Sequence, residues 1–265
     1  MKAGVAGRPI GHSLSPLIHG AWIAAAGLDA DYRAFEPADA AAFAALVAQG
    51  RAGRLRGLNV TAPFKEQALA LALADAVSET ARACGSANLL IFEAGQVRAD
   101  STDGPGLMAA LAEQASQLAV RGREVVVLGA GGAARAAVAA LIAAGARVGV
   151  LNRTRARAGI LAEDLGASVV EADALGAAVL VVNALSVPPE ISMSRLRDDA
   201  VLMDMTYRPL ETAFLAEGRA RGLATVDGLA MLIGQARPSF HALFGRDPPA
   251  VDVRALALAA LGETP

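Results

Sequence analysis

Residues 124–136 read EVVVLGAGGAARA, and this stretch decides the fold. Its apolar, β-branched run predicts a buried strand, and the glycines after it predict a tight turn into a helix. Gly129 permits the turn, Gly131 lets a pyrophosphate approach the backbone, and Ala134 lets the helix pack closely on the strand. Amide groups at the helix N-terminus would then face the anion. The stretch predicts a dinucleotide-binding unit, and the alternative is a purely structural turn of an α/β protein.

A second apolar run ends about 20 residues later at Asn152, Arg153 and Thr154, followed by Arg155 and Arg157. An enzyme that uses NAD usually offers an acidic residue there to the ribose 2′-hydroxyl, and this chain has arginines instead. A guanidinium forms charge-assisted hydrogen bonds to a 2′-phosphate, so the pattern favours NADP over NAD. The alternative is a solvated helix start, although positive charges oppose the helix dipole at that end.

The same alternation of short apolar runs and alanine- and leucine-rich stretches extends to both sides of this unit. It is typical of an α/β fold, in which helices cover a largely parallel sheet. We expect strands at residues 2–6, 57–60, 124–128, 147–151, 179–182 and 201–205, and helices at 16–26, 38–49, 133–144 and 211–221. Glycines that can end these helices in the left-handed conformation are Gly27, Gly50, Gly145 and Gly222.

A chain of 265 residues predicts two domains. Residues 102–106 read TDGPG and combine turn-forming residues with the start of a helix, so we place a boundary and a hinge near Gly104. We expect a first α/β domain of residues 1–103 and 229–265, to which the C-terminal helices return. Residues 104–228 would form the nucleotide-binding domain.

The amino-acid composition argues against several classes of function. Lys and Arg total 24 against 26 Asp and Glu, a net charge of −2, which offers no basic surface for a nucleic acid. No apolar run approaches the ~20 residues that cross a bilayer, and the first residues do not resemble a signal peptide. Cys84, the single cysteine, excludes an internal disulfide and is expected to be a packing residue in a cytoplasmic protein. His12, His19 and His241 lack the spacing of metal ligands, so we expect no metal.

Two serines lie beside the start of the first predicted helix. Ser15 precedes Pro16, which makes it a candidate N-cap with proline at the first helical position. Ser13 has no such role, and two hydroxyls near a helix N-terminus could hold a small carboxylate. Because serines are common near caps, a structural role for both stays open.

The segment NVTAPFKE, residues 59–66, passes from a strand end into a helix whose first residue we expect to be Pro63. Lys65 then lies in the first turn, where a cation meets the positive end of the helix dipole at a cost of about 0.3–1 kcal/mol. The same field lowers the pKa of a lysine and helps it to exchange a proton. The alternative is that Lys65 pairs with Glu66 on a solvated face.

Asp103 and Asn88 allow similar pairs of interpretations. Asp103 can serve as the N-cap of the helix that follows it. If it faced Lys65 across a cleft, the two groups could move a proton to or from a hydroxyl. Asn88, within GSAN at residues 85–88, is either a turn former or an amide that binds substrate hydroxyls.

Taken together, these turns resemble the shikimate dehydrogenase family over nearly the whole chain. The resembling stretches are GRPIGHSLSPLIH (7–19), NVTAPFK (59–65), GSAN (85–88), STDG (101–104), GAGGAARA (129–136), NRT (152–154), MTYRP (205–209) and GLAMLIGQ (228–235). The resemblance implies an N-terminal substrate domain, a Rossmann-like NADP-binding domain and a cleft between them. It implies reversible NADPH-dependent reduction of 3-dehydroshikimate to shikimate, in the biosynthesis of chorismate and the aromatic amino acids.

The resemblance also implies roles for single residues. Lys65 and Asp103 fall at the positions of the catalytic pair for proton transfer. Positions that bind substrate are Ser13, Ser15, Thr61, Asn88, Asp103, Tyr207 and Gln235. Positions that bind the cofactor are Gly129, Ala130, Gly131, Gly132 and Ala133 in the pyrophosphate loop, Asn152, Arg153 and Thr154 at the adenosine phosphate, and Met205 and Gly228 near the nicotinamide.

A few positions depart from the family pattern. Gly20 and Ser101 stand where the family has asparagine, and Ala236-Arg237-Pro238 is expected to interrupt a helix. Two alternatives to this function remain, a broader quinate/shikimate dehydrogenase and a non-catalytic ligand sensor on the same fold. Lys65 and Asp103 argue against the sensor, and Ser13 with Ser15 favours shikimate over quinate. The expected partner is a small-molecule substrate, without nucleic acid or membrane, and the expected state is a monomer or homodimer.

Overall fold

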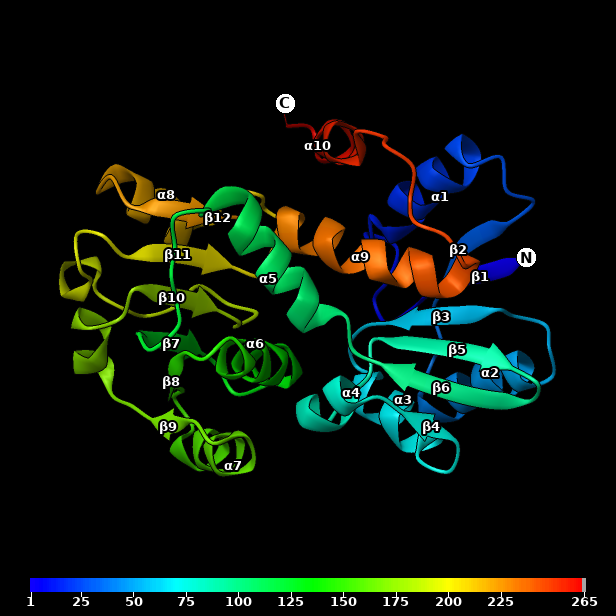
Figure 1. Cartoon of the computed structure of the whole chain (residues 1–265), viewed down its shortest axis with the longest axis horizontal. Helices are drawn as coiled ribbons and strands as arrows, with labels where there is room; N and C mark the ends of the chain where they lie inside the picture. The colour runs from blue at the N-terminus through cyan, green and yellow to red at the C-terminus, as the bar shows by residue number, and fades with distance from the viewer. Residues whose placement is uncertain (264–265) are drawn as a thin grey trace. The chain divides into compact units, whose positions relative to one another are not determined.

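The computed structural model describes residues 1–263. The chain divides into two compact units (Figure 1). The first unit comprises Met1–Thr102 and Gln235–Pro265, and the second unit comprises Asp103–Gly234. Helix α9 (Gly228–Phe244) begins in the second unit and ends in the first.

Within the described chain, the first unit holds a six-stranded mixed sheet in the order β2-β1-β3-β5-β6-β4. Its strands are β1 (Lys2–Ala6), β2 (Asp31–Phe35), β3 (Gly57–Val60), β4 (Ala76–Val77), β5 (Leu89–Glu93) and β6 (Gln96–Asp100). Strand β1 pairs in parallel with β2 and β3, whereas β5 is antiparallel to both β3 and β6. Because β5 is antiparallel to both of its neighbours, β3 and β6 run the same way.

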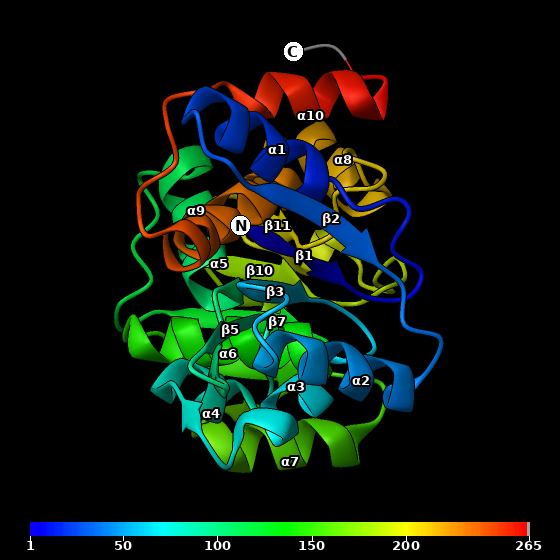
Figure 2. The same cartoon turned by 90° about the vertical axis from the view of Figure 1, so that its right-hand side faces the viewer.

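Helices cover both faces of this sheet (Figure 2). They are α1 (Ser15–Ala25), α2 (Ala40–Arg51), α3 (Lys65–Ala72), α4 (Glu79–Cys84), α10 (Val253–Leu261) and the C-terminal part of α9. Side chains alternate along β3 as strand geometry requires: Leu58 and Val60 join the apolar cluster with α2 and α3, while Asn59 reaches Ser239 of α9. The middle of the sheet therefore has one apolar face and one face with buried polar groups.

Within the described chain, the second unit holds a six-stranded parallel sheet in the order β12-β11-β10-β7-β8-β9. Its strands are β7 (Glu124–Leu128), β8 (Arg147–Leu151), β9 (Ser168–Val169), β10 (Leu180–Asn183), β11 (Val201–Asp204) and β12 (Ala224–Val226). Read in chain order from one edge this is 3-2-1-4-5-6, the doubly wound arrangement whose ligands bind where the order reverses. That switch point lies between β7 and β10.

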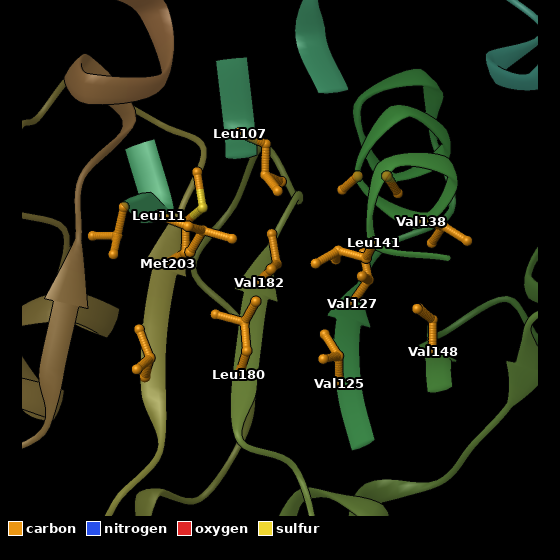
Figure 3. Close-up of a cluster of buried hydrophobic side chains, with 14 of the residues drawn as sticks. Leu107, Leu111, Val125, Val127, Val138, Leu141, Val148, Leu180, Val182 and Met203 are labelled. Carbon is orange, nitrogen blue, oxygen red and sulfur yellow. The ribbon is translucent and has the colours of Figure 1, made fainter. Parts of the chain in front are cut away.

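Packing in the second unit explains why its strands are apolar on both faces. Helices α5 (Asp103–Gln114) and α6 (Gly132–Ala143) place Leu107, Leu111, Val138 and Leu141 over Val125, Val127, Leu180 and Val182 (Figure 3). On the other face Val126, Leu128 and Val181 pack against Leu175, Phe214 and Leu215, from the 3-10 turn at Ala172–Gly176 and helix α8 (Ala213–Ala220). Helix α7 (Arg155–Leu165) follows β8.

The structure confirms the expected α/β class and the six expected strands, each to within two residues. Gly27, Gly145 and Gly222 have positive φ values of 61°, 85° and 77° as expected. The prediction for Gly50 is wrong: α2 continues through it to Arg51, and a Cβ there would collide with the Phe92 ring. Gly50 is thus required for close packing rather than for a turn.

The helix expected to be interrupted at residues 236–238 is continuous, because α9 runs through Pro238 to Phe244. Pro238 cannot donate a hydrogen bond to the preceding turn, but Phe240 and Leu243 on the same stretch are fully buried, and this packing maintains the helix. Within residues 1–263 no helix is long and apolar enough to cross a membrane.

Candidate active site

Strand directions in the first unit bring the polar turns to one edge of the sheet. The register pairs Ala6 with Val60, Asn59 with Leu89, and Leu89 with Asp100. The C-terminal ends of β1, β3 and β6 therefore lie in line with the N-terminal end of β5. The turns at residues 7–15, 61–65, 86–88 and 101–102 leave the sheet at this edge, although they are far apart in sequence.

Asn88 lies at the centre of this edge and is 4% exposed. Its backbone carbonyl accepts from Val60 N at 2.8 Å, and its backbone N–H donates to Asp100 O at 3.1 Å. Its side-chain oxygen accepts from the backbone N–H of Thr102 at 2.7 Å, and Nδ2 donates to Thr102 Oγ1 at 3.0 Å. These bonds hold both the backbone and the side chain of Asn88, which gives its amide a defined direction.

Five further buried residues continue these bonds into what we call the polar network: Tyr32, Asn59, Thr102, Gln235 and Ser239. Asn59 Oδ1 accepts from the Tyr32 hydroxyl at 2.8 Å, and Asn59 Nδ2 donates to Ser239 Oγ at 2.9 Å. Thr102 Oγ1 lies 3.2 Å from both Gln235 Oε1 and Ser239 Oγ. Buried polar groups need such partners, so the network links the sheet edge to α9.

The polar network is the part that the sequence interpretation missed, apart from Asn88 and Gln235. Two signals were available. Asn59 is a polar residue within the otherwise apolar strand Gly57–Val60, and Gln235 and Ser239 are spaced i, i+4 on one face of a helix. Neither signal reveals that Asn59 contacts this helix face, because Asn59 and Ser239 are 180 residues apart in sequence.

Lys65 is the first residue of α3, in the first turn as expected. Its carbonyl accepts from Ala87 N at 2.9 Å, which ties the start of α3 to the turn that holds Asn88. The expected helix start at Pro63 is wrong by two residues, because residues 61–64 form a turn in which Phe64 N donates to Thr61 O at 3.1 Å. Thr61 N in turn donates to Ala6 O at 2.8 Å.

The two serines at the start of α1 differ from the expected capping arrangement. Ser15 is the first helical residue and Leu14 occupies the N-cap position, so the predicted Ser15 cap is wrong. The Ser13 hydroxyl accepts from Ser15 N at 3.3 Å and fills part of that role. Ser15 is buried and Ser13 is half-buried, and both stay on the turn after β1.

Asp103 opens α5 in the second unit and is 8% exposed. It follows Thr102 of the polar network directly, so its backbone is anchored on one side by the bond between Thr102 and Asn88. Gly104 packs closely on α6, because a Cβ there would lie 3.0 Å from that of Ala140. The carboxylate thus stands at a backbone position with little freedom.

The glycine loop lies at the switch point of the parallel sheet. Gly129 has a φ of 114°, which favours glycine, and Gly131 is the N-cap of α6. A Cβ at Gly131 would meet no atom within 4 Å, so the space beside the first amides of α6 is open. This geometry fits a pyrophosphate, for which the backbone of Gly129, Ala130, Gly131, Gly132 and Ala133 would be the expected cradle.

The end of β8 carries the residues expected at the adenosine phosphate. Asn152 Nδ2 donates to Thr154 O at 2.9 Å, which shapes the turn, and Thr154 is the N-cap of α7. Arg153 is exposed in this turn, and Arg155 forms an ion pair with Glu171. Arg153 is therefore better placed than Arg155 for a phosphate that arrives from solvent.

Met205 and Tyr207 belong to a turn after β11 that a buried carboxylate shapes. Asp204 is 1% exposed; Oδ1 accepts from Thr206 N at 2.9 Å, and Oδ2 accepts from Asn183 Nδ2 and the Thr212 hydroxyl at 3.0 and 2.8 Å. A Cβ at Gly228 would collide with the backbone of Thr206. Gly228 thus lets the start of α9 approach this turn.

Comparison with known proteins agrees with this division of the chain. The family described as "Shikimate dehydrogenase substrate binding domain" matches residues 5–90, and the family described as "Shikimate / quinate 5-dehydrogenase" matches residues 110–188. The first match covers the turns at residues 7–15, 61–65 and 86–88, and the second match covers the glycine loop.

Full-length relatives extend the agreement. The shikimate dehydrogenase (NADP(+)) of Caulobacter vibrioides is 54% identical over 98% of this chain and 95% of its own length. The shikimate 5-dehydrogenase of Thermus thermophilus in complex with shikimate superposes with a TM-score of 0.91 and 36% identity, over 99% of both chains. Its complex with NADP(H) and shikimate gives a TM-score of 0.87 over 94% of this chain and 95% of the other. The chain therefore belongs to the shikimate dehydrogenase family.

Proposed function

We propose that this protein is an NADP-dependent oxidoreductase that interconverts shikimate and 3-dehydroshikimate, a step toward chorismate and the aromatic amino acids. The observation that carries the proposal is the joint presence of two sites in one family member. The first unit has buried amides and hydroxyls at one sheet edge, suited to a polyhydroxylated ligand. The second unit has an open glycine cradle at its switch point, suited to a dinucleotide.

Residues of the second unit fit NADP. The amides that begin α6 and the glycines before it would bind the pyrophosphate, and Arg153 with Asn152 and Thr154 would bind the 2′-phosphate side. Met205 and Gly228 would lie near the nicotinamide, which supplies or accepts the hydride when it is bound. The alternative in which Arg153 is only a solvated residue predicts equal affinity for NAD and NADP.

Residues of the polar turns would bind the substrate. Ser13, Ser15 and Tyr207 would hold its carboxylate through hydroxyl donors. Its ring hydroxyls would meet Thr61, Asn88, Asp103 and Gln235. Asn88 and Gln235 suit this role because the polar network fixes their amides before a ligand arrives, which lowers the entropic cost of binding.

Lys65 and Asp103 would perform the proton transfer. In the direction of reduction, the Lys65 ammonium would donate a hydrogen bond to the substrate carbonyl oxygen and stabilise the negative charge that develops there. It would then supply the proton, and Asp103 would orient the reacting oxygen and share that proton. In the direction of oxidation, the same pair would remove the proton from the hydroxyl.

This assignment gives each unit a role. We assign substrate binding to residues 1–103 and 229–265, and NADP binding to residues 104–228. We also propose a cytoplasmic location and a monomeric or homodimeric state, which fractionation and sedimentation would test.

Oxidation of quinate is the second candidate, because the family description that matches residues 110–188 includes it. The decisive experiment measures absorbance at the nicotinamide band with shikimate or quinate, each combined with NADP or NAD. We expect the highest kcat/KM with shikimate and NADP. A higher kcat/KM with quinate would transfer the function to the broader enzyme, and binding of shikimate without turnover by any pair would favour a ligand sensor.

A further inference from the structure

We infer that Thr102 is a positioning residue that determines which end of the Gln235 amide faces the substrate, an inference that rests on the proposed function. Thr102 is 4% exposed and lies between β6 and α5. Both its backbone and its side chain contact residues of the polar network. It is not among the residues to which the family resemblance gives a role.

The backbone N–H of Thr102 fixes the direction of the Asn88 amide. The backbone N–H of Thr102 can only donate, and it lies 2.7 Å from Asn88 Oδ1. The oxygen of the Asn88 amide must therefore face it. Asn88 Nδ2 is then the atom 3.0 Å from Thr102 Oγ1, so the Thr102 hydroxyl accepts at this contact.

Since the Thr102 hydroxyl accepts from Asn88, its own proton is available for another partner. Three oxygens lie 3.2 Å from Thr102 Oγ1: Asn88 Oδ1, Ser239 Oγ and Gln235 Oε1. Asn88 Oδ1 already accepts from the Thr102 backbone N–H, and Ser239 Oγ already accepts from Asn59 Nδ2, so we assign the Thr102 proton to Gln235 Oε1. Asn88 Nδ2 also points to Gln235 Oε1, at 3.4 Å. Two donors thus converge on the Gln235 side chain at one atom, and that atom must be its oxygen.

The rest of the network enforces the same direction. Asn59 Nδ2 donates to the Asn88 carbonyl at 3.2 Å and to Ser239 Oγ at 2.9 Å, so Asn59 Oδ1 is left to accept from Tyr32. The Ser239 hydroxyl donates to the Gln235 carbonyl at 3.0 Å. A reversed Gln235 amide would place N–H groups against the donors of Thr102 and Asn88.

The consequence is a specificity rule. Gln235 offers its NH₂ group to the ligand, so it recognises an oxygen that accepts, such as a ring hydroxyl or a carbonyl. A ligand with an ammonium group at that place, which only donates, is rejected. Thr102 produces this selectivity without contacting the ligand.

The test uses Thr102→Val, which keeps the backbone N–H and the approximate volume and removes only the hydroxyl. Thr102→Ser restores the hydroxyl, and Thr225→Val is the matched control at a half-buried threonine of β12, outside the network. We expect Thr102→Val to raise KM for shikimate about 10-fold, with KM for NADP within about twofold of wild type. Thr102→Ser should recover most of the affinity, and Thr225→Val should change neither KM. An unchanged KM for shikimate in Thr102→Val overturns the inference.

A double-variant cycle separates positioning from general destabilisation. If Thr102 acts through Gln235, adding Thr102→Val to Gln235→Ala should raise KM less than about twofold further. Recurrence of the full factor in the double variant would show that Thr102 acts by another route and would contradict the inference.

Nuclear magnetic resonance tests the positioning role of Thr102 without relying on enzyme activity. Side-chain NH₂ signals of Asn88 and Gln235, assigned by their loss in Asn88→Ala and Gln235→Ala, should shift and exchange faster with solvent in Thr102→Val but not in Thr102→Ser. Unchanged signals overturn the positioning role. If wild type shows no turnover of shikimate, the proposed function fails, and these signals still test Thr102.

Discussion

The two units prepare their ligand sites by opposite means. In the first unit, buried side chains of Asn59, Asn88 and Thr102 occupy one end of a mixed sheet and hold one another in place. In the second unit the site is backbone, an open glycine turn above a core of Val, Leu and Ala (Figure 3). Side chains can distinguish the hydroxyls of a small ring, whereas amides suffice for a pyrophosphate. Substitutions should therefore affect the two ligands separately.

The largest effect should come from Lys65→Ala. We expect kcat to fall ~10²–10⁴-fold, the range for loss of a general acid or base. The Kd for NADP should stay within about twofold, because Lys65 belongs to the first unit. Stopped-flow turnover and cofactor titration would measure both values. Lys2→Ala, at the exposed start of β1, is the control; turnover of Lys65→Ala near that of this control would remove Lys65 from the mechanism.

Leu141→Ala tests the claim that the second unit depends on packing. Leu141 lies on the buried face of α6 and is fully buried, so its truncation should lower the free energy of unfolding by about 2–5 kcal/mol. KM for shikimate in the folded enzyme should not change. Urea unfolding gives the first quantity, and Ile160→Ala, at a side chain 61% exposed, is the matched control. Equal losses in the two variants would contradict the packing claim.

His19 tests whether buried polar groups make the first unit sensitive to acid. Its ring is fully buried and stacked on Tyr32 at 4.1 Å, and burial lowers its pKa from 6.5 to about 3. Between those values the unfolded chain binds a proton that the folded chain excludes, so stability falls as pH falls. Roughly 2 kcal/mol should be lost between pH 6.5 and 5.

His19→Phe keeps the aromatic stack and removes the titrating group. The free energy of unfolding of the variant, measured at pH 5 and pH 7, should therefore change less than that of wild type. The same pH dependence in both proteins would assign the acid sensitivity to other groups.

The smallest effect should be that of Arg153→Ala on the cofactor. Loss of a charged hydrogen bond to the 2′-phosphate should raise the Kd for NADP about 10-fold and leave that for NAD unchanged. Arg155→Ala is the matched control, because Arg155 is ion-paired with Glu171. Isothermal titration would compare the cofactors, and a parallel loss for NAD would show that Arg153 does not read the phosphate.

The difference between the units also explains what could be predicted from the sequence. In the second unit, β7, β8, β10 and β11 follow from local signals, because each is a mainly apolar run, and the glycine loop follows β7 directly. Strands β9 and β12, of two and three residues, were not predicted, because they are too short to carry such a pattern. The polar network depends on pairing across distant segments, so Asn59, Thr102 and Ser239 could not be placed as a group. The β5–β6 hairpin was not predicted, although Gln96–Asp100 alternates between exposed and buried residues. The start of α1 lies one residue before the expected position, at Ser15, although Pro16 does fall in its first turn. The start of α3 lies two residues after Pro63, because proline marks a turn as readily as a first helical position.

The hairpin has a practical consequence for engineering. Its two-residue turn, Ala94 and Gly95, has positive φ at both positions, 49° and 79°, and is exposed at the opposite end of the strands from Asn88. Adding one residue to each strand beside this turn would create a new cross-strand pair there and leave the pairing of Leu89 with Asp100 intact. The turn is thus a suitable insertion point for an affinity tag or a fluorescent reporter in a catalytically competent enzyme.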